Sequence, residues 1–122
     1  MDLDPTATDP GKYTVVFENE RVRVLEYTDL PGNRTSPHQH PDSVMVTLTS
    51  FRRRLIRGEM QRDVEQAAGR ASWLPAQQHA GQNIGDTPTH AIFVELKGSS
   101  AVQGGSSGSG PSTSSGLGPS TG

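Results

Sequence analysis

Three of the four histidines lie at positions where their side chains could form a metal site. His38 and His40 are separated by one residue, and alternate side chains of an extended strand project from the same face. Two imidazoles placed in this way are a natural pair of ligands for a divalent metal, with metal–nitrogen distances of about 2.0–2.1 Å. His79, about forty residues further along, is a candidate third ligand. Exposed histidines on an edge strand would show the same spacing, so both interpretations stay open at this point.

The composition limits the chemistry of such a site and the class of protein. The chain has 122 residues, 11 Lys and Arg against 13 Asp and Glu, and no Cys, which is enough chain for one domain. A formal charge of -2 lacks the broad basic field that non-specific nucleic-acid binding needs. Without cysteine there is no disulfide, thiolate zinc site, iron–sulfur cluster or thiol nucleophile. Any metal must therefore be held by imidazole, carboxylate or amide groups.

The distribution of apolar residues predicts a cytoplasmic location. No apolar run approaches the roughly 20 residues that a membrane helix needs, and the acidic residues 1–5 do not resemble a signal peptide. We therefore expect a soluble protein that binds neither nucleic acid nor a membrane. Hydrophobic residues make up only 30% of the chain, and a lean core is typical of a domain that buries further surface by forming a homodimer.

The composition also divides the chain into three parts. Residues 98–122 are rich in Gly and Ser and carry no charge, so they cannot offset their ordering entropy by burial and are predicted to be a disordered tail. Residues 1–11 contain two prolines and three aspartates and are predicted to be a disordered leader. Residues 12–97 then form the folded domain.

Within this domain, short strand-like runs alternate with turn residues, at 13–17, 21–24, 44–49, 51–57 and 91–96. The last run is apolar on nearly both faces, which predicts a central strand. Within residues 21–27, the apolar residues occupy even-numbered positions up to Val24 and odd-numbered positions from Leu25 onward. This change of strand face suggests a bulge between the two residues. Residues 59–68 contain good helix formers followed by Gly69, but the surrounding strand rhythm favours a β-hairpin arm around residues 63–65. The pattern predicts an all-β barrel or sandwich.

Residues 32–83 resemble the two sequence motifs of the cupin superfamily. The first motif places His-x-His five residues after a glycine, as Gly32, His38 and His40 do here. The second motif has its glycine, proline, histidine and asparagine at Gly69, Pro75, His79 and Asn83. Two departures accompany the match. The glutamate that follows the second histidine in cupins is missing, since Val44 and Met45 stand there, and the second motif is one residue short and lacks its inner glycine.

The resemblance implies a cupin-like double-stranded β-helix, or jelly-roll barrel, over residues 12–97. It implies that His38, His40 and His79 hold a divalent metal ion without a carboxylate, with iron first and manganese, nickel or zinc as alternatives. Three-histidine cupins include thiol dioxygenases and diketone-cleaving dioxygenases, which use non-haem iron. Asp42 and Gln77 are candidates for an additional ligand. The resemblance to small cupins also implies a homodimer with exchanged N-terminal strands.

Three functions stay open on these grounds. The first is an enzyme that acts on a small polar molecule by oxygenase-type or other metal-assisted chemistry. The alternative is a non-catalytic module that binds a small ligand or a metal, and the third is a structural barrel with vestigial ligands. No residue outside the ligands is identified as a catalytic base, so whether the protein is an enzyme is left open.

Other polar residues have simpler interpretations. The basic run at residues 51–57 is typical of a solvated edge strand, with a docking surface for an anionic substrate as the alternative. Arg34 is the candidate arginine at the mouth of the pocket. Trp73 is expected in the barrel wall or in a dimer interface. His90 is expected to be a core residue, or a group that supports the ligands, and not a ligand itself.

Overall fold

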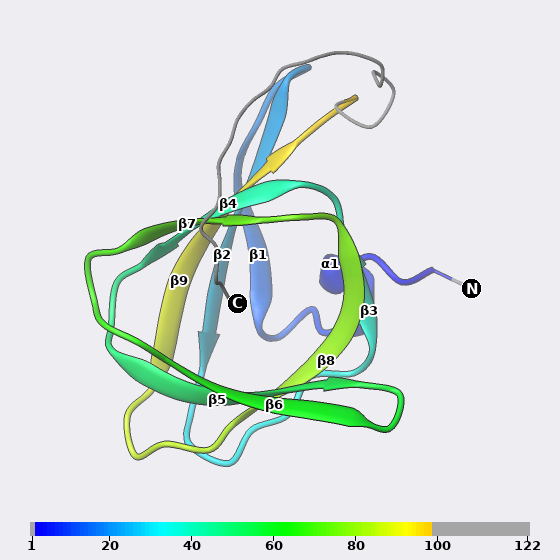
Figure 1. Ribbon diagram of the computed structural model, residues 1–122. Coiled ribbons are helices and arrows are strands. Elements are labelled where there is room, and N and C mark those ends of the chain that lie inside the picture. The colour runs from blue at the N-terminus through cyan, green and yellow to red at the C-terminus, as the bar shows by residue number, and fades with distance from the viewer. Residues whose placement is uncertain (1, 99–122) are drawn as a thin grey trace.

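A computed structural model describes residues 2–98. They form a barrel of two antiparallel sheets, wrapped as a double-stranded β-helix (Figure 1). In spatial order across the sheet, the five-stranded sheet contains β1 (Tyr13–Glu18), β2 (Val22–Asp29), β9 (Thr89–Leu96), β4 (Ser43–Thr47) and β7 (Ala71–Leu74). The four-stranded sheet contains β3 (His38–His40), β8 (Gln77–Asn83), β5 (Phe51–Arg57) and β6 (Met60–Gln66). The all-β jelly-roll prediction is confirmed.

The core of the barrel is built on β9, which lies between β2 and β4 in the middle of the larger sheet. Its alternate residues, beginning with Thr89 and including Phe93, are buried inside the barrel, while Ile92 and Val94 on the other face are half-buried. A strand that carries apolar residues on both faces is best accommodated in the centre of a sheet. The prediction that this strand is central is confirmed.

The outer face of the same sheet carries a row of apolar side chains that oppose one another across all five strands. Strand register places them side by side, in the order Phe17, Val24, Val94, Val44 and Trp73. The two residues at the ends of the row, Phe17 and Trp73, are about half exposed, at 54% and 50%. Among residues 2–98, no further layer covers this face.

The predicted bulge in the second strand is wrong. β2 pairs with β9 without interruption from Val22 to Asp29, and the change of apolar parity arises because Leu25 and Tyr27 face the core while Val24 lies on the half-buried outer face. The irregularity lies instead in the partner strand β1, between Val15 and Phe17.

Residues 51–66 form the hairpin that the strand rhythm predicted. β5 pairs with β6 from Phe51–Gln66 to Arg57–Met60, and Gly58 in the turn has a φ of 59°, which favours glycine. The expectation of an edge strand for the basic run is wrong, because β5 lies between β8 and β6. Arg53 consequently points into the barrel and is only 7% exposed.

The N-terminal residues differ from the predicted disordered leader. They form helix α1 (Pro5–Thr8), which is capped by Asp4 and lies beside β3 (Figure 1). Asp9 is buried and its carboxylate accepts the backbone N–H of Ser36 at 3.0 and 3.1 Å. These polar contacts explain how a segment poor in apolar residues is held against the barrel.

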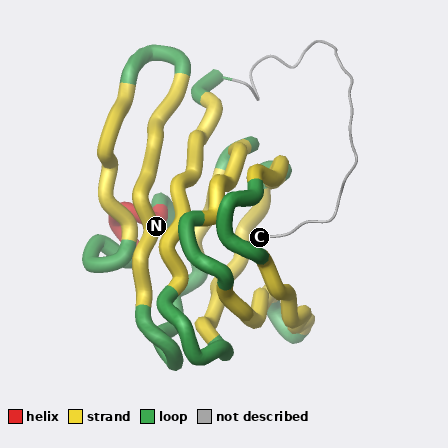
Figure 2. Tube along the Cα trace, turned by 90° about the vertical axis from the view of Figure 1, so that its left-hand side faces the viewer, coloured by secondary structure: helices red, strands yellow, loops and turns green. Residues whose placement is uncertain are grey.

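Figure 2 shows that strands make up most of the domain and that the helix is one short turn at its side. The predicted tail lies outside the described residues apart from Gly98. Among residues 2–98 there is no helix with the length and apolar character needed to cross a membrane.

Candidate metal centre

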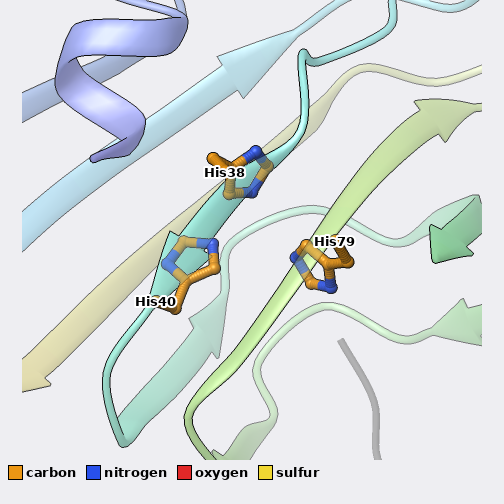
Figure 3. Close-up of side chains that lie close together, drawn as sticks. All are labelled: His38, His40 and His79. Atoms are coloured by element: carbon orange, nitrogen blue, oxygen red, sulfur yellow. The ribbon is translucent and has the colours of Figure 1, made fainter. Parts of the chain in front are cut away.

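Two neighbouring strands bring the three histidines together. β3 pairs with β8 in the register that places His38 directly opposite His79, and His40 follows His38 on the same inward face. Figure 3 shows the three rings facing one another across the strand pair. One ligand nitrogen from each ring lies within 4.8 Å of the other two. All three residues are buried, with exposed fractions of 1%, 2% and 8%.

Each ring is oriented by an oxygen that accepts a hydrogen bond from Nδ1. His38 donates to the carbonyl oxygen of Ser36 at 2.7 Å, and His40 Nδ1 lies 3.4 Å from Glu95 Oε2. His79 donates to Gln77 Oε1 at 3.1 Å, and the Gln77 amide is fixed in this orientation because its nitrogen donates to a backbone carbonyl. With the proton on Nδ1, Nε2 of each ring carries the lone pair, as a metal ligand requires.

The environment also favours the neutral form of His38 and His79. Burial, followed by the effect of the neighbouring His40, lowers the pKa of His38 to about 4. Burial likewise lowers the pKa of His79 to about 3, followed by the effects of His40 and His38 and smaller effects of Arg53 and Arg57. Both side chains are therefore neutral at pH 7, in the protonation state that binds metal ions.

The two candidates for an additional ligand have other roles. Asp42 accepts the backbone N–H of Ala76 at 2.8 Å and does not line the cavity beside the histidines. Gln77 contacts His79 through Nδ1, opposite the nitrogen available to a metal, so it orients the ring. His90 lies outside the group of three histidines. Its side chain is half-buried and its Nε2 is 2.6 Å from Glu26 Oε2, so the expectation of a core residue or of a group that supports the ligands is wrong.

Two residues that contact the histidines were missed by sequence reasoning. The hydroxyl of Tyr13 lies 3.3 Å from His38 Nε2. Burial raises the pKa of this phenol well above its usual value, and the nearby Tyr27 has the next largest effect.

The second residue is Glu95, which is only 3% exposed. It connects His40 to Arg23, whose guanidinium is 2.8 Å from the carboxylate. The sequence contained a signal for Glu95, because this residue lies on the same strand face as Phe93. It contained none for Tyr13, which resembles any aromatic residue of a first strand.

The arginine beside the histidines is Arg53 and not Arg34. Arg34 is exposed and forms an isolated backbone bridge with Gln82. Arg53 lines the cavity inside the barrel, together with the three histidines and apolar side chains such as Phe93. The cavity volume is about 20 Å³, which is room for roughly one water molecule.

The residues present fit a divalent metal ion. Three imidazoles converge from two paired strands, each held by an oxygen at Nδ1, and this donor set suits zinc, iron, nickel or copper better than magnesium or calcium. Among residues 2–98, His38, His40 and His79 form the one group of His, Asp or Glu side chains whose ligand atoms are close enough together to hold an ion. No carboxylate belongs to the group.

Comparison with solved structures identifies the family. The chain is similar to a cupin domain from Bordetella pertussis, with 31% identity over 70% of this chain and 91% of that one and a TM-score of 0.66. It is also similar to a protein with a double-stranded β-helix domain from Klebsiella pneumoniae, at 22% identity over 72% and 79% of the two chains and a TM-score of 0.57. The chain belongs to the cupin superfamily.

Among more distant structures is the polyketide cyclase RemF from Streptomyces resistomycificus, at 18% identity over 69% of this chain and 63% of that one, with a TM-score of 0.54. This likeness shows the fold alone. No family model and no curated protein sequence matches the chain.

Proposed function

We propose that the protein is a metal-dependent cupin in which His38, His40 and His79 hold a divalent ion that binds a small molecule and acts on it. The observation that carries the proposal is the convergence of three buried imidazoles, each with its Nδ1 proton donated to an oxygen. Iron is the expected metal, and manganese, nickel and zinc are the alternatives with the same preference for imidazole.

Three protein ligands leave coordination positions open, as catalytic sites do and closed structural sites do not. An ion bound there supplies Lewis-acid polarisation or, for iron or manganese, electron exchange. The protein's own groups hold the ring orientations through Ser36, Glu95 and Gln77, and the burial of the three histidines excludes bulk water. Tyr13 keeps its proton at neutral pH, and its hydroxyl lies 3.3 Å from the His38 nitrogen that would bind the ion.

Elemental analysis of the purified protein tests this proposal. We expect close to one equivalent of iron, manganese, nickel or zinc in the wild type, and loss of that metal in the His79→Ala variant, because two remaining imidazoles chelate too weakly. His90→Ala is the matched control, since His90 lies outside the cluster, and its metal content should equal that of the wild type. An unchanged metal content in His79→Ala would contradict the assignment of the site.

The same preparation distinguishes an enzyme from a binding module. Oxygen uptake that depends on both the metal and an added small molecule would support the oxygenase-type function. Stoichiometric metal and ligand binding without turnover would support the non-catalytic alternative, for which the small size of the cavity is the main argument.

A further inference from the structure

Arginines follow one face of the β5–β6 hairpin from inside the barrel to its surface. Arg53 and Arg57 share a face of β5 because they are four residues apart, and Arg62 on β6 lies opposite Leu55 between them. Arg53 lines the interior cavity, whereas Arg57 and Arg62 line an adjoining groove of about 430 Å³. His79 lines both spaces, so the groove leads to the candidate metal centre.

The opposite face of the hairpin also carries arginines, but these are neutralised by carboxylates on the neighbouring strand. The pairs are Arg52–Glu65 at 3.3 Å and Arg54–Asp63 at 2.8 Å. Within residues 2–98, by contrast, neither Arg57 nor Arg62 forms an ion pair, and the groove has no acidic side chain in its lining. The hairpin thus separates an outer face whose arginines are paired from a face on which Arg53 is paired with Asp29 and Arg57 and Arg62 carry uncompensated positive charge.

Arg53 retains hydrogen-bonding capacity inside the barrel. Its guanidinium donates to Asp29 at 2.7 Å, and also to Thr89 and Tyr27, both at 3.2 Å, while its Nε–H has no acceptor among residues 2–98. Gly81 makes room for this group, because a Cβ there would lie 2.8 Å from Nη2. The strand that carries His79 therefore admits a cation next to the cavity.

We propose that the small molecule bound at this centre is an anion, and specifically a carboxylate, which enters along the groove past Arg57 and Arg62 and is held between the three histidines and Arg53. The inference rests on the proposed function. Three imidazole ligands contribute no negative charge, so the charge of a divalent ion at the site is left for a further ligand to compensate. Positively lined clefts concentrate anions and accelerate their binding. The cavity of about 20 Å³ has room for roughly one water molecule, so the carboxylate reaches into it with one oxygen, and the larger groove takes the remainder of the molecule.

The test uses the cobalt(II)-loaded full chain, whose visible spectrum reports first metal binding and then ligand binding at the metal. We would titrate acetate, with acetamide as a neutral molecule of the same shape. Arg53→Lys keeps a cation beside Asp29 but removes the planar set of donors, and should weaken acetate binding about tenfold, as expected for a lost hydrogen bond to a charged group. The double variant Arg57→Gln/Arg62→Gln should weaken it about threefold, with a smaller effect at high salt.

The matched control is the double variant of Arg52→Gln and Arg54→Gln, which removes the same charge from the other face of the hairpin and should change acetate affinity less than about twofold. If Arg53→Lys does not fold, the groove variant and its control decide the question. Equal acetate binding in all variants, or acetamide binding as tight as acetate binding, would overturn the inference while leaving the metal centre intact. Failure of the wild type to bind cobalt would overturn the proposed function, and this inference with it.

Discussion

The strongest quantitative prediction concerns the stability of the metal-free protein in acid. His38 and His79 have pKa values of about 4 and about 3 in the folded protein, compared with 6.5 for an unperturbed imidazole. The unfolded chain therefore binds protons between pH 6.5 and pH 4 that the folded protein does not bind. Stability is fully retained above pH 6.5 and is lost as the pH falls through this window.

The size of the loss can be worked out for a change from about pH 7 to about pH 5. An imidazole of pKa 6.5 in the unfolded chain is almost fully protonated at pH 5, whereas one of pKa 4 or below in the folded protein is almost fully neutral. The difference corresponds to about 2 kcal/mol for each histidine, and it hardly depends on whether the folded value is 3 or 4. The two together remove about 4 kcal/mol from a total stability of roughly 5–15 kcal/mol.

Urea denaturation at pH 7 and pH 5, in the presence of a chelator, measures this loss. The wild type should lose about 4 kcal/mol of unfolding free energy, and the His79→Gln and His38→Gln variants about 2 kcal/mol each, because each variant removes one of the two titrating groups. The comparison between pH values cancels any change that a substitution makes to stability at pH 7. An equal loss in the wild type and in both variants would refute the link between these histidines and acid stability.

Three further predictions follow from the packing. Glu95→Gln should weaken metal binding about tenfold, measured by competition with a chelator, because the carboxylate orients His40; unchanged affinity would contradict that role. Asp29→Ala should lower the unfolding free energy by about 3–5 kcal/mol in urea, since it leaves the buried Arg53 guanidinium without its carboxylate; a loss below about 1 kcal/mol would contradict it. The homodimer stays a prediction, and Trp73→Glu on the exposed apolar row should convert it to a monomer in light scattering at micromolar concentration, whereas a monomeric wild type would contradict it.

The sequence predicted the structure correctly where the spacing of residues along the chain determines which side chains lie on the same face of a strand. The placement of His38 and His40 on one strand face follows from the two-residue period of a strand, and the link to His79 came from the spacing of a second motif. The central position of β9 followed from its apolar character on both faces. The β5–β6 hairpin was harder, because residues 59–68 favour a helix locally and only pairing with β5 stabilises the strand.

The residues that sequence reasoning placed wrongly depend on which way a strand faces. In the run of residues 51–57, alternate arginines point in opposite directions, and Arg53 lies inside because it shares its strand face with the buried Phe51. The N-terminal residues were taken as disordered from their composition. Their Asp4–Pro5 pair is nevertheless a recognisable helix start, with an N-cap followed by proline at the first helical position. The average composition of the segment predicted disorder, whereas the helix start depends on only the two residues Asp4 and Pro5, which an average does not reveal.

The central position of β9 also determines how the chain can fold. Val22 pairs with Leu96, so the larger sheet joins residues from the two ends of the described segment. Until the last strand has been synthesised, a growing chain can form local hairpins such as β1–β2 and β5–β6 but cannot connect β2 to β4. Closing such a long loop carries an entropic cost that is repaid only when β9 docks. We therefore expect folding to be slow compared with helical domains of this size, and the barrel to be completed only after β9 has left the ribosome.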